Sequence, residues 1–380
     1  MVYRKIQNTD VSISQLGFGC MRLPLTDIYD PTAIDEEKAV EMLRYAVEHG
    51  LNYFDTAHPY HRETSERFMG STLSRMYRDR ICLATKLPMW HVKSADDCDR
   101  LFKEQSQRLQ TDRIDMYLLH ALNKRSWKTV QEYDVLSFLD GLKKKGKIQY
   151  AGFSFHDELP LFKEIVDAYP WTVCLIHLNY VDCDYQAGLS GLEYAYKKGI
   201  AVQIMEPLRG GKLAQRVPRE VQEIIRRTDR DQSAAQFALR WLFNRPEVCC
   251  VLSGMSSLDE VRENIEFASH DHRDTISDEE MKLYAEARAV YRKRTRINCT
   301  QCGYCMPCEQ KIPISFILEL YNDAYMYNAH DDSCRAYRVF IRPENRPDKC
   351  TQCGTCEERC PQNVPIIESL QEAHKSFTQD

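Results

Sequence analysis

Eight short apolar runs alternate along the chain with longer stretches of helical periodicity, and this alternation constrains the fold more than any other feature. The runs are continuously apolar rather than alternating, which is typical of strands buried on both faces of a parallel sheet. They occupy residues 15–19, 51–55, 81–86, 114–120, 148–153, 173–178, 200–205 and 248–252.

The segments between these runs carry apolar residues at helical spacing. They predict helices at 35–49, 65–76, 95–109, 129–145, 158–168, 185–198, 232–243 and 258–268, with a short one at 221–227. An open doubly wound sheet and a (β/α)8 barrel both fit this alternation, but eight runs over about 290 residues favour the barrel. Gly17 and Gly19 lack the third glycine of a dinucleotide fingerprint, which argues against a Rossmann domain.

A second feature follows the last of these segments. Nine of the sixteen cysteines fall between residues 299 and 360, and eight of these form two runs. The first run contains Cys299, Cys302, Cys305 and Cys308, and the second contains Cys350, Cys353, Cys356 and Cys360, which Pro361 follows.

The second run has the C-x2-C-x2-C-x3-C-P spacing of bacterial two-cluster ferredoxins, and the first is a near copy with two residues in its last gap and Glu309 in place of the proline. In that arrangement the fourth thiolate of each run ligates the other cluster. Crosswise pairing assigns Cys299, Cys302, Cys305 and Cys360 to one [4Fe-4S] cluster, and Cys350, Cys353, Cys356 and Cys308 to the other. Zinc ribbons use separated CxxC pairs and fit this spacing poorly. Disulfides are typical of secreted proteins, and no signal peptide is visible.

Composition and charge exclude several classes of function. The chain has 43% hydrophobic and 28% charged residues, which is ordinary for a globular protein. Its formal net charge of −5 gives no reason to expect nucleic-acid binding. No apolar run is long enough to span a membrane. We therefore expect a cytoplasmic protein with no membrane or nucleic-acid partner.

Chemistry on a barrel is expected at the carboxyl ends of its strands. Asp55, Lys86 and His120 end three successive runs, and Tyr60 follows the first of them. A buried lysine needs a partner, and Asp55 is placed to provide one. The lysine charge is expected to lower the pKa of the Tyr60 phenol, which would then act as a general acid toward a carbonyl oxygen. His120 would help to orient that oxygen.

These residues and their spacing resemble the aldo-keto reductase superfamily from about residue 3 to residue 270. The resemblance implies Asp55, Tyr60, Lys86 and His120 as the catalytic tetrad. The cysteine-rich tail resembles the branch that carries a C-terminal ferredoxin-like domain. The expected architecture is thus an α/β chain, with an aldo-keto reductase-like (β/α)8 TIM barrel over residues 1–290. A small α+β, ferredoxin-like 2[4Fe-4S] domain is expected over residues 291–380.

The family binds NADPH or NADH, and the resemblance implies a set of cofactor-binding positions, although Phe155 and Leu175 depart from its pattern. Glu260 falls near a position that is often basic where NADPH is bound, and a carboxylate there disfavours the extra phosphate, so we expect NADH over NADPH. The implied positions are Ser154, His177, Leu208, Gly210, Gly254, Met255, Ser256, Ser257, Glu263 and Asn264.

Three hypotheses about function remain open at this point. The first is reduction of a small-molecule carbonyl, or oxidation of an alcohol, with Tyr60 as general acid/base and a nicotinamide or cluster electron source. The second is a cluster-fed, single-electron reductase with a degenerate nicotinamide site, because clusters pass one electron and nicotinamide passes two. The third is a non-enzymatic redox sensor or binding scaffold. No flavin-binding signature is visible, and an electron-donor protein is an expected partner.

Between the two cysteine runs, the segment 314–327 predicts a helix, and the segment 328–348 predicts a long loop.

Overall fold

The computed structural model describes residues 1–380 apart from 28–29, 229, 300–304, 361–362 and 380. The chain divides into two compact units. The first comprises Met1–Gly210 and Ala238–Ile276, and the second comprises Gly211–Phe237 and Ser277–Asp380. The expected domain boundary at residue 290 falls within α13 (Asp278–Arg294), in the second unit, and that division stays a prediction.

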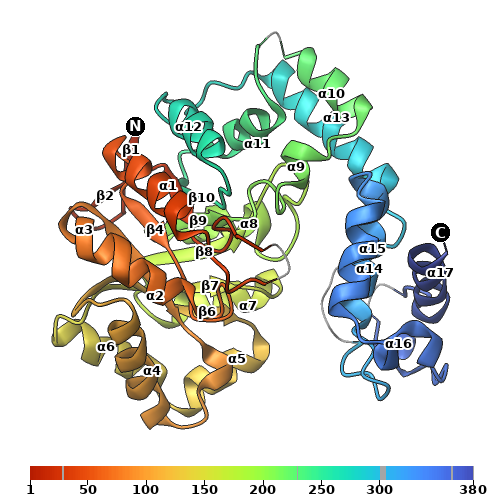
Figure 1. The fold of residues 1–380 in the computed structure, drawn as a ribbon, viewed down its shortest axis with the longest axis horizontal. Coiled ribbons are helices and arrows are strands. Elements are labelled where there is room, and N and C mark those ends of the chain that lie inside the picture. Colours follow the sequence, from red (N-terminus) through yellow and green to blue (C-terminus); the bar gives the residue numbers. More distant parts are fainter. Residues whose placement is uncertain (28–29, 229, 300–304, 361–362, 380) are drawn as a thin grey trace. The chain divides into compact units, whose positions relative to one another are not determined.

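The first unit is a closed barrel of eight parallel strands in the order β10-β3-β4-β5-β6-β7-β8-β9 (Figure 1). Each predicted run contributes one strand, so the (β/α)8 prediction is confirmed. The strands are β3 (Leu16–Gly19), β4 (Tyr53–Asp55), β5 (Cys82–Leu87), β6 (Ile114–Leu122), β7 (Ile148–Phe155), β8 (Val173–His177), β9 (Ala201–Met205) and β10 (Val248–Ser253).

Helices follow the strands, and their apolar stripes are buried. In α1 (Glu36–Glu48), for example, Asp35 caps the first turn and residues at helical spacing are buried. The other helices of this part of the chain are α2 (Ser65–Met69), α3 (Arg75–Tyr77), α4 (Ala95–Arg108), α5 (Lys124–Glu132), α6 (Val135–Lys144), α7 (Leu159–Ala168), α8 (Gly188–Lys197), α11 (Ala234–Phe243) and α12 (Leu258–Phe267).

Two predicted helices are interrupted. The segment 129–145 is broken between α5 and α6, where Asp134 has a left-handed backbone with φ of 48°. The segment 65–76 changes to a π-helix at Gly70–Ser74. A side chain at Gly70 would lie 2.1 Å from the Arg108 carbonyl oxygen, so close packing against the end of α4 requires glycine there.

A hairpin of β1 (Tyr3–Lys5) and β2 (Ser12–Ser14), which the sequence reading missed, covers the amino-terminal end of the barrel. Ile6 and Ile13 pack there in one cluster with Tyr53 and Cys82, the first residues of β4 and β5. The opposite end, where Asp55 and Lys86 lie, is therefore left for chemistry.

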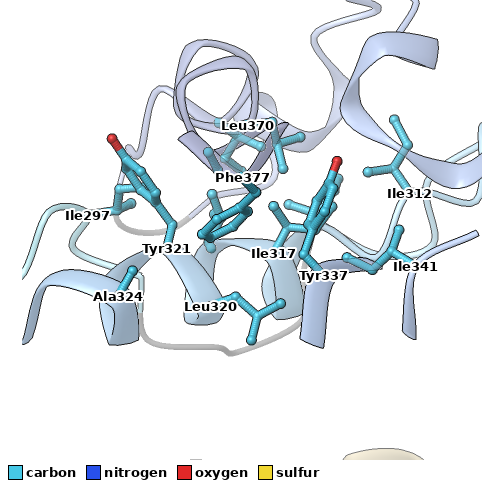
Figure 2. Packing of buried hydrophobic residues seen from close by; sticks show 14 of the residues in the cluster. Ile297, Ile312, Ile317, Leu320, Tyr321, Ala324, Tyr337, Ile341, Leu370 and Phe377 are labelled. Carbon is cyan, nitrogen blue, oxygen red and sulfur yellow. The ribbon is translucent and has the colours of Figure 1, made fainter. Parts of the chain in front are cut away.

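The second unit is helical in its described part. It contains α9 (Lys212–Gln215), α10 (Arg219–Arg226), α13, α14 (Ile314–Met326), α15 (His330–Phe340), α16 (Thr355–Glu358) and α17 (Ile366–Thr378). Apolar side chains from α14, α15 and α17, among them Ile317, Tyr337 and Phe377, form one core (Figure 2).

Two expectations about this unit differ from the structure. The segment predicted as a long loop at 328–348 contains α15, because Tyr337 and Ile341, four residues apart, bury their side chains in the core. The tail was expected to be α+β, but the described residues after 294 form helices and no strand. Two amphipathic helices occupy the space between the cysteine runs instead. Among the described residues, no helix is long and apolar enough to cross a membrane.

Candidate active site

The centre of the site is a buried ion pair at the carboxyl ends of β4 and β5. These strands are neighbours in the barrel, so Asp55 and Lys86 are brought together by the sheet itself. Lys86 Nζ lies 2.6 Å from Asp55 Oδ1 and donates also to the Thr56 carbonyl oxygen at 2.9 Å. Lys86 is 1% exposed and Asp55 is 2% exposed, so both charges are removed from water.

Burial alone would lower the pKa of Lys86, but the Asp55 charge and the hydrogen bonds outweigh it and raise that pKa. Lys86 therefore stays charged at neutral pH. Burial also raises the pKa of Asp55, and Lys86 offsets part of that rise. Asp55 Oδ2 is buried without a hydrogen-bond partner in the described part of the chain, so Lys86 is the main source of compensation for this carboxylate.

Tyr60 lies in the segment after β4, and its hydroxyl oxygen is 3.2 Å from Lys86 Nζ. The sequence-based expectation of a lowered phenol pKa is wrong in its net direction. Burial is the largest effect and raises the pKa of Tyr60, while Lys86 lowers it only in part. The phenol therefore keeps its proton at neutral pH, with a cation beside it.

The segment that carries Tyr60 is anchored by its neighbour His61. Nε2 of His61 accepts from the Leu23 backbone N–H at 3.2 Å, and Nδ1 lies 2.9 Å from the Pro31 carbonyl oxygen. These two bonds require a neutral ring with its proton on Nδ1. Consistent with this, burial lowers the pKa of His61. Because these bonds hold His61 against the loop that contains Leu23 and Pro31, the position of Tyr60 does not depend on Lys86 alone.

A second buried network lies beneath Lys86. Glu66, in α2, accepts from Thr85 Oγ1 at 2.7 Å and from Gln105 Nε2 at 2.6 Å, and it pairs with Arg108 Nε at 2.7 Å. Gln105 Nε2 also donates to the Lys86 carbonyl oxygen at 2.9 Å. The network joins α2 and α4 to β5 and so fixes the strand end that presents the lysine.

His120 lies near the carboxyl end of β6, and its ring meets the Tyr60 ring edge-on with centroids 6.3 Å apart. Burial lowers the pKa of His120 well below its usual value, and the Lys86 charge lowers it further. The imidazole is therefore neutral at neutral pH. Its Nδ1 is buried and has no hydrogen-bond partner among the described residues. A neutral ring of this kind can orient a polar group but does not supply a proton as an imidazolium would.

Two of the predicted cofactor residues, Ser154 and His177, lie at the ends of β7 and β8. Ser154 is buried, and its Oγ accepts from the Ala121 backbone N–H at 2.8 Å. His177 Nε2 lies 3.0 Å from Asp182 Oδ2, which also accepts from Arg209 Nη1 at 2.5 Å. Although burial opposes it, Arg209 and His177 lower the pKa of Asp182, so His177 is held by a carboxylate.

The departures from the family pattern also have places in the fold. Phe155 is fully buried and packs edge-on against Phe162 of α7, with ring centroids 5.1 Å apart. Leu175 lies in the apolar interior of the barrel. Neither side chain offers a polar group to a cofactor.

The loops after β9 and β10 carry the glycines predicted to approach a cofactor. The Arg22 side chain, after β3, lies against both. A Cβ at Gly210 would be 2.9 Å from Arg22 Nη2, and one at Gly254 would be 3.0 Å from Arg22 Cδ. Arg22 was not among the cofactor-binding residues predicted from the sequence. A basic residue just after a strand end was the only available signal, and nothing in the chain order linked it to glycines about 190 and 230 residues away.

The remaining predicted cofactor positions surround these loops. Leu208 is half-buried before Gly210, and Met255 is buried after Gly254. Ser257 caps α12, and its Oγ accepts from the Glu260 backbone N–H at 3.3 Å. Glu260 Oε2 in turn accepts from the Ser256 backbone N–H at 2.7 Å and from its hydroxyl at 3.1 Å. Further along α12 lie Glu263, half-buried, and Asn264, which donates to Ser253 Oγ.

In the second unit, five of the predicted metal ligands line one cavity of about 510 Å³, counted with its opening to solvent. Four of them, Cys308, Cys350, Cys353 and Cys356, are the set assigned by crosswise pairing to a single cluster, and Cys305 is the fifth. Cys299 and Cys360 are half-buried and pack against the same apolar core. Cys302 lies outside the described residues.

Residues 15–289 match the sequence model of the Aldo/keto reductase family. The chain belongs to the aldo/keto reductase family. Residues 298–364 match a 4Fe-4S dicluster domain. This aldo/keto reductase is therefore an oxidoreductase with a 4Fe-4S domain. This assignment excludes the hypothesis of a non-enzymatic redox sensor or binding scaffold.

Named relatives agree with this assignment. The chain is 28% identical over 285 residues to L-galactose dehydrogenase of Arabidopsis thaliana, covering 69% of this chain and 86% of that protein. It is 23% identical over 304 residues to the NADH-specific methylglyoxal reductase of Escherichia coli, covering 68% of this chain and 90% of that protein. The holo form of the aldo-keto reductase AKR11C1 from Bacillus halodurans superposes with a TM-score of 0.62 at 25% identity, over 76% of this chain and 96% of that one.

The residues present fit both kinds of cofactor that the family and the dicluster domain imply. Cysteine thiolates are the ligands of 4Fe-4S clusters, and cysteines of both runs converge on one cavity. At the barrel, the lack of side chains at Gly210 and Gly254 lets Arg22 lie against both loops, and its guanidinium suits the diphosphate of a nicotinamide cofactor. These observations support iron–sulfur and nicotinamide cofactors.

Proposed function

We propose that the barrel reduces a small-molecule carbonyl, or oxidises the corresponding alcohol, with Tyr60 as the general acid/base and NADH as the preferred reductant. The observation that carries the proposal is the 3.2 Å contact between the Tyr60 hydroxyl and Lys86 Nζ, whose charge Asp55 holds in place. A protonated phenol beside a fixed cation is suited to give up its proton only when a strong base forms next to it.

In the reducing direction, the substrate carbonyl oxygen accepts a hydrogen bond from Tyr60. As negative charge develops on that oxygen, the phenol transfers its proton, and the phenolate that remains is stabilised by Lys86. Asp55 keeps Lys86 charged throughout, because it raises the pKa of that lysine. In the oxidising direction the same phenolate takes the proton from the alcohol.

His120 has an orienting role in this proposal. The ring is neutral because of burial and the nearby Lys86 charge, so it adds no second cation to the site. Its ring stands edge-on to Tyr60, and a neutral imidazole presents one donor and one acceptor. It can therefore hydrogen-bond the substrate oxygen and leave the proton transfer to Tyr60.

When bound, nicotinamide supplies or accepts a hydride. We propose that Ser154 and His177 hold the nicotinamide end and that Arg22, with the loops at Gly210 and Gly254, binds the diphosphate. The close approach of Arg22 to both glycines supports this. A guanidinium suits phosphate because its donors form a planar fork.

The preference for NADH rests on Glu260. Its carboxylate accepts both donors of Ser256 at the start of α12, so a negative charge lies near a position that the family resemblance assigns to binding the 2′-phosphate of NADPH. A second anion there would be repelled. The name of the Escherichia coli relative, an NADH-specific reductase, is in accord with this preference.

A second candidate is a reductase that receives single electrons through the cysteine-held centres and has lost part of its nicotinamide site. The burial of Phe155 and Leu175 favours it, because neither side chain can contact nicotinamide through a polar group. In this candidate Tyr60 and Lys86 would still protonate the substrate oxygen.

Substitution of Tyr60 by phenylalanine tests the proposal. We expect turnover of small aldehydes and α-dicarbonyls with NADH to fall by at least about 100-fold, the usual share of general acid catalysis. The circular dichroism, the iron content and NADH binding should stay as in the wild type. Tyr45→Phe, on the outer helix α1, is the matched control and should retain activity. Undiminished turnover in Tyr60→Phe would remove this residue from the mechanism. NADH binding without NADH-dependent turnover in the wild type would favour the second candidate.

A further inference from the structure

An exposed apolar and basic surface lies on the outer face of α15. Phe340 is 68% exposed and Val339 is 59% exposed, the two highest values among the large hydrophobic side chains described as exposed. The two are adjacent in sequence. Exposure of phenylalanine and valine side chains to water is unfavourable. An adjacent exposed pair therefore points to a contact with another molecule.

The same face is basic. Arg335 and Arg338 lie three residues apart on α15, Arg342 follows two residues after its end, and all three are exposed. Tyr337 and Ile341, on the other face, are buried in the core (Figure 2). We call the exposed set Arg335, Arg338, Val339, Phe340 and Arg342 the α15 surface. From Arg335 to Lys349 the chain has five basic and two acidic side chains, while the two carboxylates of α15, Asp331 and Asp332, lie in its first turn.

The α15 surface lies close to the cysteine cavity. The Phe340 ring meets the Phe316 ring edge-on, with centroids 6.3 Å apart. Phe316 is in the first turn of α14, two residues after Ile314, which lines the cavity. Two residues advance a helix by about 3 Å, and a helix is about 10 Å across, so the aromatic pair lies within about one helix diameter of the cavity wall. Phe316 also packs on the same core as Cys305 and Cys350.

We propose that the α15 surface is the docking site of a small acidic electron-carrier protein of the ferredoxin class. An apolar centre with basic residues around it is complementary to a carrier with an acidic surface, and opposite charges speed association and orient the partners. One electron would pass per encounter, so that the carrier is oxidised by one electron and the cysteine-held centre is reduced by one. The proposal goes beyond carbonyl reduction and does not depend on which nucleotide the barrel binds.

Binding of an acidic [2Fe-2S] ferredoxin to the anaerobically purified holoprotein, measured by calorimetry, tests this proposal. We expect Phe340→Ser to raise the Kd about tenfold, the effect of about 1.4 kcal/mol of lost apolar burial. Arg342→Glu should also raise the Kd and should weaken its dependence on salt between low and moderate ionic strength. Mixing with reduced ferredoxin should change the visible absorption of the holoprotein more slowly in both variants.

Tyr196→Ser on α8 and Arg219→Glu on α10 are the matched controls, since both residues are exposed and lie on other helices. Their Kd and rates should equal those of the wild type, with iron content unchanged in all four variants. Absence of ferredoxin binding, or equal Kd in Phe340→Ser and wild type, would overturn the proposal. Self-association that Phe340→Ser abolishes would assign the surface to a second copy of the chain instead. A large loss of thermal stability in Phe340→Ser with an unchanged Kd would show that the protein itself covers this face, and would also overturn the proposal.

Discussion

Replacement of Lys86 by methionine removes the positive charge from the centre of the site while keeping a long apolar side chain. Asp55 then loses the partner at 2.6 Å. Because Asp55 is 2% exposed and its second oxygen has no partner among the described residues, the carboxylate would be left buried and uncompensated. Removing one member of a buried ion pair typically costs about 3–5 kcal/mol.

That cost is a large part of the stability of an ordinary protein, which is about 5–15 kcal/mol. We therefore expect Lys86→Met to fold but to unfold at a clearly lower urea concentration at pH 7. The double variant Lys86→Met with Asp55→Asn removes the stranded charge as well, so it should recover more than half of the loss. Neither variant should turn over substrate, because no cation remains to stabilise the Tyr60 phenolate.

Tryptophan fluorescence is a suitable probe, because all four tryptophans lie in the barrel unit and report on its unfolding alone. They are Trp90, Trp127, Trp171 and Trp241. Urea titrations of wild type, Lys86→Met, Asp55→Asn and the double variant form a complete double-mutant cycle. A loss below about 1 kcal/mol in Lys86→Met, or a double variant no more stable than Lys86→Met, would refute the account of a compensated buried pair.

Three further predictions concern other parts of the chain. Because the pKa of His120 is depressed in the folded protein, its contribution to the free energy of unfolding should be complete above about pH 6.5 and should be lost as the pH falls below that value. The loss from this residue should be at most about 1.4 kcal/mol per pH unit. In urea titrations, His120→Asn should flatten this dependence on pH. An unchanged slope would show that the ring is not held neutral. Arg22→Ala should raise the Kd for NADH about tenfold in a fluorescence titration, while Arg44→Ala on α1 should leave it unchanged. The same Kd in Arg22→Ala and in the wild type would remove Arg22 from the diphosphate site. Cys353→Ser should lower the iron content by about half while Cys334→Ser retains it, and full iron in Cys353→Ser would reject the assigned ligands.

The barrel was predictable because its strands are buried on both faces, which leaves continuous apolar runs between helices of clear periodicity. The four residues proposed as the tetrad could be selected for a related reason. Once the strands were assigned, Asp55, Lys86 and His120 fell at the ends of neighbouring strands, and the structure brings them together with Tyr60 at one end of the barrel.

Other features depend on contacts that chain order does not reveal. The pKa of Tyr60 was expected to fall because of Lys86, but the extent of burial decides its direction, and burial cannot be judged from neighbouring residues in the sequence. Arg22 meets Gly210 and Gly254 only through closure of the barrel between β3 and β10. The sequence of α15 predicts a loop because the core that stabilises this helix is contributed by α14 and α17.

An anaerobic titration of the holoprotein with NADH and with NADPH tests the central claim most directly, namely that this aldo/keto reductase uses nicotinamide at the Tyr60–Lys86 site. The nicotinamide absorbance and the visible cluster band are followed together, before and after addition of a carbonyl substrate. We expect NADH to bind more tightly than NADPH, and we expect the amount of NADH consumed to equal the amount of alcohol formed. Failure of both nucleotides to bind would contradict it.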